Sequence, residues 1–310
     1  MNTNRTVTWA VALLISVLLS EGLAKEKSAG GGAPDPHTKR GVELIQEKKF
    51  DEAIGEFTKA IQADPGNPRY YCNRGTAYRA AGKFPEAMAD FSKAVQIAPK
   101  DYLGYFERGQ TLLALKQLDQ AMENLDKALE LKPGDPNSLK FRGFVWIGRT
   151  EWDKAIADFT AAIEKEPNDF QSYERRAFAS RSLKNYDAAI ADYSKSLELK
   201  GDEPETWAKR GYTYSLMQQY EKAISDFEQA MKLNPNDPDT PQRLQYARSM
   251  LAAKNAPPPT ATPAPTPESA GLITPLNIGI ALAVIVIIAV VVRMLTRGKP
   301  EETSSSTRIR

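Results

Sequence analysis

Residues 68–101 read PRYYCNRGTAYRAAGKFPEAMADFSKAVQIAPKD, and the small and aromatic positions of this stretch return every thirty-four residues along the chain. Three series keep this period: the glycines Gly41, Gly75, Gly109, Gly143 and Gly211, with Ala177 in the fifth slot; the alanines Ala53, Ala87, Ala121, Ala155, Ala189 and Ala223; and the prolines Pro65, Pro99, Pro133, Pro167 and Pro235, with Gly201 in the gap. A fixed period of this length is typical of a solenoid, in which each unit buries its apolar face only against its neighbours.

Within each unit the apolar spacing predicts two helices joined by a short turn. In residues 68–101 small or apolar side chains fall three or four apart on two segments: Tyr71, Gly75 and Tyr78, then Ala87, Phe91, Ala94 and Val95. Residues 81–83 (AGK) separate the two segments. The residues predicted to cap the first helices are Asn67, Asp101, Asp135, Asp169 and Asp237, followed in several units by a proline: Pro68, Pro136, Pro204 and Pro238.

The combined pattern resembles the tetratricopeptide repeat (TPR) family. Its positions are glycine, aromatic, alanine, aromatic, alanine and proline, which read Gly75, Tyr78, Ala87, Phe91, Ala94, Pro99 in the second unit and Gly211, Tyr214, Ala223, Phe227, Ala230, Pro235 in the sixth. The resemblance implies an all-α, right-handed superhelical solenoid over residues 36–237, with six repeats at about 34–67, 68–101, 102–135, 136–169, 170–203 and 204–237. A capping helix is expected over 238–254. The fifth repeat departs from the pattern at Ala177, Ser180, Ser196 and Gly201, which predicts lower local stability.

Arginines also keep the period, each directly before the glycine position: Arg40, Arg74, Arg108, Arg142, Arg176 and Arg210. A ladder of cations is compatible with a phosphate or nucleic-acid track. Acids recur in the second helices at Glu56, Asp90, Asp158, Asp192 and Asp226, so we favour structural ion pairs within each repeat. The formal net charge of +2, from 41 basic and 39 acidic residues, supports the second interpretation, and no nucleic-acid partner is expected.

The start of the chain has the order of a secretory signal. Arg5 precedes an apolar run over residues 7–19, and the small residues Gly22 and Ala24 follow before Lys25. We predict a signal peptide over residues 1–24, cleaved after Ala24, and a flexible lead-in over 25–35. An uncleaved anchor helix is the alternative, although the run is short for a hydrocarbon core about 30 Å thick.

The other end of the chain predicts a membrane anchor. A Pro-rich linker over 255–271 precedes an apolar segment at 272–292, which has the length of a spanning helix. Arg293, Arg297 and Lys299 begin a basic tail over 293–310, and no Lys or Arg lies between Lys254 and Arg293. The positive-inside rule therefore predicts a single-pass protein, of a bacterial cell membrane, with a cytoplasmic tail and extracytoplasmic repeats. A buried core helix is the alternative for 272–292, but the segment has no polar face.

The family resemblance implies that the first helices line a concave groove. Carried over by register, the expected partner-binding residues are Arg79, Phe106, Gln110, Leu113, Phe144, Ile147, Phe178, Arg181 and Tyr212. An aromatic stripe flanked by Arg79 and Arg181 suits an extended segment or helix with apolar anchors and some acidic groups. The alternative is that these rings pack sideways against neighbouring helices.

Enzymatic chemistry finds little support in the sequence. The chain has one cysteine and one histidine, which leaves no Cys/His metal cluster and no intrachain disulfide. No G-x-x-x-x-G-K nucleotide loop occurs, so we expect no cofactor, no metal, no small-molecule substrate and no catalytic residues. The sequence predicts a membrane-anchored scaffold or adaptor that binds a protein partner or peptide segment in the groove. A chaperone-like assembly factor that holds exported or unfolded clients is the alternative.

Overall fold

The computed structural model describes residues 35–256, and this part of the chain contains thirteen helices and no strand. The helices are α2 (Pro36–Gln46), α3 (Phe50–Ala63), α4 (Pro68–Ala80), α5 (Phe84–Ile97), α6 (Tyr102–Ala114), α7 (Leu118–Leu131), α8 (Pro136–Gly148), α9 (Trp152–Lys165), α10 (Phe170–Ser182), α11 (Tyr186–Leu199), α12 (Pro204–Leu216), α13 (Tyr220–Leu233) and α14 (Thr240–Asn255).

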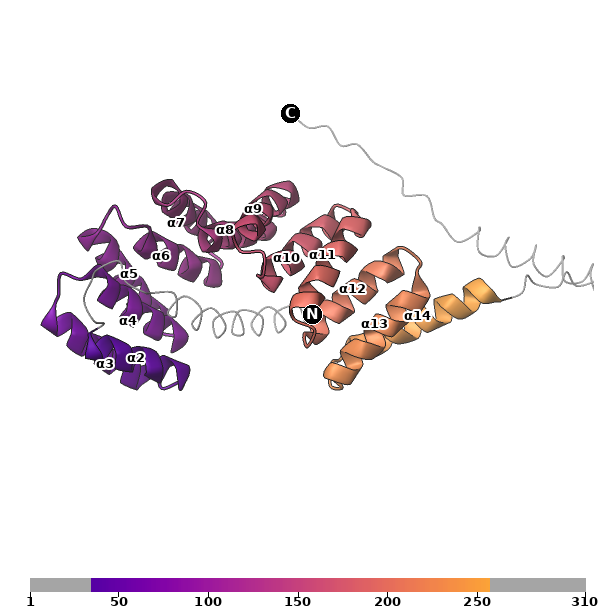
Figure 1. Ribbon diagram of the computed structural model, residues 1–310, viewed down its shortest axis with the longest axis horizontal. Helices are drawn as coiled ribbons and strands as arrows, with labels where there is room; N and C mark the ends of the chain where they lie inside the picture. Colours follow the sequence, from indigo (N-terminus) through magenta and orange to yellow (C-terminus); the bar gives the residue numbers. More distant parts are fainter. Residues whose placement is uncertain (1–34, 257–310) are drawn as a thin grey trace, which may run out of the picture. The chain divides into compact units, whose positions relative to one another are not determined.

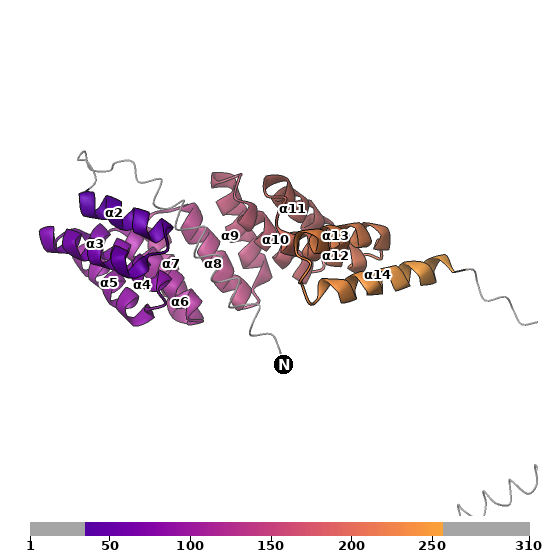
Figure 2. The same ribbon diagram turned by 90° about the horizontal axis from the view of Figure 1, so that it is seen from below.

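These helices form six antiparallel hairpins, α2–α3 to α12–α13, stacked in chain order with α14 after the last one (Figure 1). The turned view shows the same succession of hairpins (Figure 2). Each hairpin packs on the next, and the first helices of neighbouring hairpins also contact one another, as α4 does with α6 and α6 with α8. The predicted all-α repeat solenoid is therefore confirmed.

The periodic glycines allow the two helices of a hairpin to approach closely. A Cβ atom added at Gly75 would lie 2.6 Å from Cε1 of Phe91, and one added at Gly41 would lie 2.7 Å from the ring of Phe57. Both rings are completely buried. The glycine and the aromatic sixteen residues later are thus two halves of one contact, which explains why they recur together.

The predicted caps are present at the starts of the first helices. Side chains of Asn67, Asp101, Asp135 and Asp169 accept hydrogen bonds from backbone amides in the first turn of the following helix. Asp237 accepts from both the amide and the hydroxyl of Thr240. Helix α14 begins at Thr240, two residues beyond Pro238.

Each hairpin turn ends its first helix with one residue in the left-handed conformation. Only the second turn uses glycine, Gly82, at φ 76°. The equivalent residues of the other hairpins are not glycine: Lys48, Lys116, Thr150, Lys184 and Gln218, all with φ between 57° and 64°. At the first turn, the amide of Lys48 donates to Ile45 O and that of Lys49 to Leu44 O, which is the Schellman arrangement.

The periodic arginines form ion pairs inside their own repeats. Arg74, Arg142, Arg176 and Arg210 each make two hydrogen bonds of 2.7–2.8 Å to the acid sixteen residues later, Asp90, Asp158, Asp192 and Asp226 respectively. Each guanidinium also reaches the preceding hairpin, as Arg74 does to Thr58. The hydrogen bond to Asp158 raises the pKa of Arg142. These cations are satisfied internally, which contradicts a phosphate track.

Two members of the series differ from this arrangement. Arg108 donates to the amide oxygen of Asn124 at 2.6 Å, because the third repeat carries no acid at that position. The predicted pair between Arg40 and Glu56 is wrong: Arg40 contacts Glu43 and Glu47, and Glu56 contacts His37. Arg40 belongs to the first hairpin, and residues 35–256 include no preceding hairpin to complete its contacts.

The fifth repeat contains buried polar groups without partners. Tyr193 takes the place of phenylalanine and is completely buried, while Ser196 takes the place of alanine and is 1% exposed. Neither hydroxyl has a hydrogen-bond partner among the described residues. Burial raises the pKa of the Tyr193 phenol. An unpaired buried hydroxyl costs about 1–3 kcal/mol, which supports lower local stability in this repeat.

The membrane segments expected from the sequence cannot be located here. None of the helices between residues 35 and 256 combines the length and apolarity that a bilayer span requires. The predicted signal peptide (1–24), spanning helix (272–292) and tail (293–310) lie outside the described residues. So do all but the edges of the lead-in (25–35) and of the linker (255–271).

Candidate partner-binding groove

The nine residues expected in the groove lie on the first helices α4, α6, α8, α10 and α12. Their exposure differs widely. Arg79 is buried, at 6% exposed, and Tyr212 is exposed, at 40%. The other seven are half-buried: Phe106, Gln110, Leu113, Phe144, Ile147, Phe178 and Arg181. These nine residues are called the groove face below. The most exposed of them, Tyr212, lies at the C-terminal end of the row.

Arg79 is bonded inside the array. Its guanidinium lies 2.7 Å from Oε2 of Glu107, donates to Thr111 Oγ1 at 3.2 Å and covers the ring of Phe91 at 5.5 Å. Because Glu107 and Thr111 belong to α6, these contacts tie α4 to the next first helix. Arg79 is thus a structural residue, and its Nη1 is occupied by partners on α6.

The middle of the groove face is aromatic. Edge-to-face contacts join Phe106 to Phe141, Phe141 to Phe144 and Phe144 to Phe159, with centroids 5.5–5.6 Å apart. Phe106, Leu113 and Phe144 pack against the buried cluster around Leu125. These rings therefore contribute one face to the core, as the sideways-packing alternative expects, and leave part of their surface exposed.

Buried ion pairs connect the first helices beyond this aromatic segment. Lys140, which is 3% exposed, lies 3.0 Å from Asp169, and Glu174 pairs with Lys209 of α12. Burial alone would raise the pKa of Glu174, but the charges of Arg175 and Lys209 and the hydrogen bond from Lys209 lower it to about 2. Glu174 is thus ionised at neutral pH, and it neutralises the cations beside it.

The C-terminal end of the groove face carries alternating rings and guanidinium groups. Arg181 covers the Phe178 ring at 5.2 Å and the Tyr212 ring at 5.4 Å, and Arg243 of α14 covers Tyr212 at 5.5 Å. Sequence reasoning missed Arg243. The signal was present, because Arg175, Lys209 and Arg243 follow one another at the thirty-four-residue period.

A hollow of about 380 Å³ lies beside this stack, between α12 and α14. Its lining comprises Tyr212, Ser215, Leu216, Phe227, Gln242, Arg243 and Tyr246. Leu216 and Tyr246 are 41% and 56% exposed, so three large apolar side chains, Tyr212 included, gather at its rim. The Ser215 hydroxyl is buried there without a hydrogen-bond partner.

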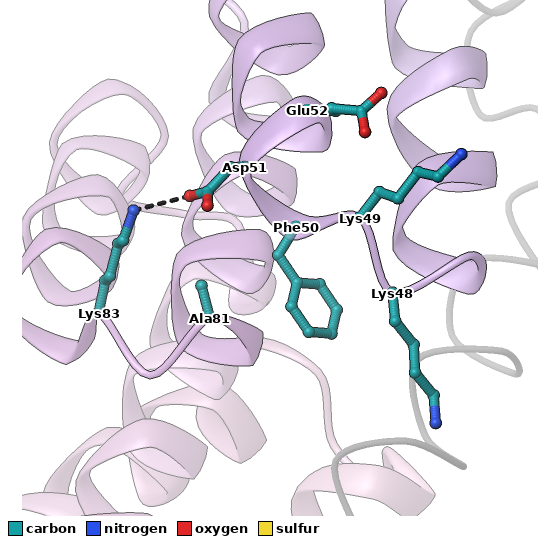
Figure 3. Close-up of a pocket in the computed structure, with 7 residues that line it drawn as sticks. All are labelled: Lys48, Lys49, Phe50, Asp51, Glu52, Ala81 and Lys83. Atoms are coloured by element: carbon teal, nitrogen blue, oxygen red, sulfur yellow. Dashed lines mark hydrogen bonds and ion pairs between the residues drawn. The ribbon is translucent and has the colours of Figure 1, made fainter.

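A second hollow, of about 350 Å³, lies at the opposite end of the array between the first two hairpin turns. Figure 3 shows its lining: Lys48, Lys49, Phe50, Asp51, Glu52, Ala81 and Lys83. Lys83 pairs with Asp51 at 2.8 Å, while Lys48 and Lys49 point away from that pair. Its charges are nearly balanced and it offers a single ring, so the C-terminal hollow is the better candidate.

Comparison with known families identifies the repeats. Tetratricopeptide repeat family models match residues 68–101, 102–135, 147–204 and 204–237, which together make up about half of the chain. A comparison with curated proteins finds no significant match.

Solved structures share the fold at low sequence identity. The APC/C hetero-tetramer Cut9–Hcn1 is similar at 19% identity and a TM-score of 0.62, covering 76% of this chain and 46% of its own. This chain thus spans less than half of that relative. PilF of Pseudomonas aeruginosa follows at 16% and 0.60, covering 69% and 95%. YrrB, described as a TPR protein with an unusual peptide-binding site, is 19% identical with a TM-score of 0.52, covering 62% and 97%.

At these low identities the solved structures support the fold alone, whereas the family models identify the repeats themselves. Proteins of this fold are generally non-enzymatic interaction scaffolds. The repeat pattern, the stacked hairpins and the family matches lead to one conclusion: the chain belongs to the tetratricopeptide repeat family, whose members mediate protein–protein interactions.

Proposed function

We propose that this chain is a membrane-anchored scaffold that binds a protein partner, or a peptide segment of one, on its groove face outside the cytoplasm. The observation that carries the proposal is the partly exposed stack of Phe178, Arg181, Tyr212 and Arg243 beside the C-terminal hollow. Aromatic and arginine side chains are the residue types that most often dominate binding energy at protein interfaces.

The sequence outside residues 35–256 supports the membrane part of the proposal. The apolar segment 272–292 is followed at once by Arg293, Arg297 and Lys299, and the chain begins with the order of a secretory signal. A reporter that is active only in the cytoplasm, fused after Lys254, is expected to be silent. The same reporter fused after Arg310 is expected to be active. Activity after Lys254 contradicts the extracytoplasmic placement.

Site-specific photo-crosslinking in intact cells tests the binding face. A photoreactive residue replaces Gln110 or Tyr212 on the groove face, or Gln120, which is exposed on the second helix α7. We expect adducts from positions 110 and 212 and none from 120. Equal adducts from position 120 contradict groove binding.

The same experiment separates the scaffold from the assembly factor. A scaffold gives one adduct of defined mass, because it has one stoichiometric partner. A factor that holds unfolded clients gives many adducts of different mass at the same two positions. The exposed apolar rim formed by Tyr212, Leu216 and Tyr246 is the feature that supports the assembly factor as a second candidate, because exposed apolar patches mark interaction sites.

A further inference from the structure

At the C-terminal end of the groove face, the charge of Glu174 is shared among three cations, Arg175, Lys209 and Arg181. No carboxylate among residues 35–256 lies within 4.0 Å of the Arg181 guanidinium, whose neighbours are the rings of Phe178 and Tyr212. Arg243 has only a 3.8 Å contact with Asp239, and both of those side chains are exposed. Elsewhere on the groove face the cations are paired, as Arg79 is with Glu107 and Lys209 with Glu174.

The two arginines flank one ring, which fixes their spacing. The guanidinium groups of Arg181 and Arg243 each lie within 5.5 Å of the Tyr212 centroid. A guanidinium held over a ring face by cation–π attraction loses little freedom on binding and keeps N–H donors available to an acceptor. The two guanidinium groups can therefore donate hydrogen bonds to two separate carboxylates, or to one carboxylate and a carbonyl.

The hollow beside these arginines is apolar with a few polar groups. Tyr212, Leu216 and Tyr246 form an exposed rim, and the buried Phe227 closes the floor. Ser215, Gln242 and Arg243 are the polar residues of the lining. Small hollows that combine apolar walls with a few directed polar groups are typical of binding sites for one anchoring side chain.

We propose that the hollow between α12 and α14 binds a peptide segment of a protein partner in which an apolar side chain is flanked by carboxylates. The apolar side chain packs against Tyr212, Leu216 and Tyr246. The flanking carboxylates accept hydrogen bonds from Arg181 and Arg243. This inference rests on the proposed groove function and names the chemistry of the segment that the groove selects.

The test uses the full-length chain in detergent micelles and a displayed library of random dodecapeptides. We expect the enriched peptides to carry Asp or Glu within two residues of Leu, Ile, Val or Phe. Affinity is then measured by fluorescence polarisation with a fluorescein-labelled synthetic copy of an enriched peptide. Arg181→Gln, Arg243→Gln and Leu216→Asp should each weaken binding by about tenfold or more, and added salt should weaken it further.

Matched variants on α14 and on the neighbouring helix α13 control for general effects. Arg248→Gln removes an exposed arginine of α14 that pairs with Glu228, and Leu233→Asp removes an apolar side chain of α13 that is 38% exposed. Neither residue lines the hollow, so both variants should bind as the parent does. All five variants change exposed or half-buried side chains, and circular dichroism checks that each is folded.

The outcomes distinguish this inference from the function on which it rests. Enriched peptides without acids, or affinity unchanged by both arginine variants, overturn the inference. If such peptides still lose affinity in Phe178→Ala, the groove function stands while the assigned chemistry fails. If no peptide is enriched and the photo-crosslinks at positions 110 and 212 are also absent, both fail.

Discussion

At the scale of single residues, the array depends on a contact between a missing side chain and a ring. Gly75 leaves room for Phe91, and the same exchange recurs at Gly143 with Phe159. The ring then fills the space between the two helices without exposure. The fifth repeat shows the limit of this rule, because Ala177 faces Tyr193 there and the tyrosine hydroxyl finds no partner.

Gly75→Ala should therefore destabilise the protein although alanine favours helices. The added Cβ would lie 2.6 Å from Phe91, so the packed ring must move, which costs about 1–3 kcal/mol. Gly55→Ala is the matched control, because no atom lies within 4 Å of its added Cβ. That change should stabilise the helix by about 0.5–1 kcal/mol. Urea unfolding followed by circular dichroism measures both, and equal effects of the two changes would contradict the packing argument.

At the scale of the helix and its turn, four of the six hairpins are closed by two devices. The first is the left-handed residue that ends the first helix, and the second is the arginine–aspartate pair between the two helices. Five of the six turns use a non-glycine residue in the left-handed conformation, which costs roughly 1 kcal/mol at each. These turns are accordingly places where the chain is not optimised for stability.

Thr150→Gly tests the cost of such a turn. Thr150 is exposed, adopts φ 60°, and is β-branched, which makes it the least suited of the five to that conformation. We expect its replacement to raise the free energy of unfolding by about 0.5–1 kcal/mol. Gly82→Thr is the reverse change at φ 76° and should lower it by a similar amount. A loss of stability in Thr150→Gly would show that the threonine side chain contributes more than the backbone strain.

The buried carboxylate between α10 and α12 predicts a pH dependence. The pKa of Glu174 is lowered from 4.5 to about 2, so its ionised form stabilises the fold above pH 4.5. This contribution is lost as the pH falls from 4.5 through 2. Glu174→Gln removes the buried carboxylate from Lys209, which keeps its contact with Glu205, and should cost about 1.5–3 kcal/mol at pH 7. Thermal unfolding of both proteins at several pH values should show the difference between them shrinking over this window; a constant difference would contradict it.

The sequence was sufficient to predict the fold because its thirty-four-residue period reflects contacts that recur within the repeats. The glycine, the ring and the arginine–aspartate pair lie in one repeat, so their spacing in sequence is their geometry in space. The groove was harder to predict, because position in the register does not say which side chain is already bonded. Arg79 and Arg181 share one position in the repeat register. Glu107 pairs with Arg79, whereas Arg181 contacts aromatic rings. Arg243 was missed because it lies on α14, where the glycine–aromatic pattern stops.

At the scale of the whole repeat array, stability is local, because each hairpin contacts only its neighbours. A weak repeat is therefore not rescued by distant parts of the chain. The hairpin α10–α11 contains the unpaired hydroxyls of Tyr193 and Ser196, and its helix α10 also carries Phe178 and Arg181 of the groove face.

Tyr193→Phe should stabilise this hairpin by about 1–2 kcal/mol, because it removes a buried hydroxyl that has no partner. Phe159→Tyr places a hydroxyl at the equivalent position of the fourth repeat, where the ring tip already meets Gly143, and should destabilise. In Tyr193→Phe, hydrogen exchange measured by mass spectrometry should show that amide protection rises above that of the parent in α10, α11 and their immediate neighbours. A change spread evenly from α2 to α14 would contradict local cooperativity.

The ion pairs that span sixteen residues have a genetic consequence. Since four of the six arginines find an aspartate within their own repeat, the coding unit of each of those repeats carries its own cross-link. Duplication or deletion of one whole unit leaves each of these remaining arginines with its aspartate. Length can thus change in steps of thirty-four residues during evolution, while the stack on either side of the junction keeps its architecture.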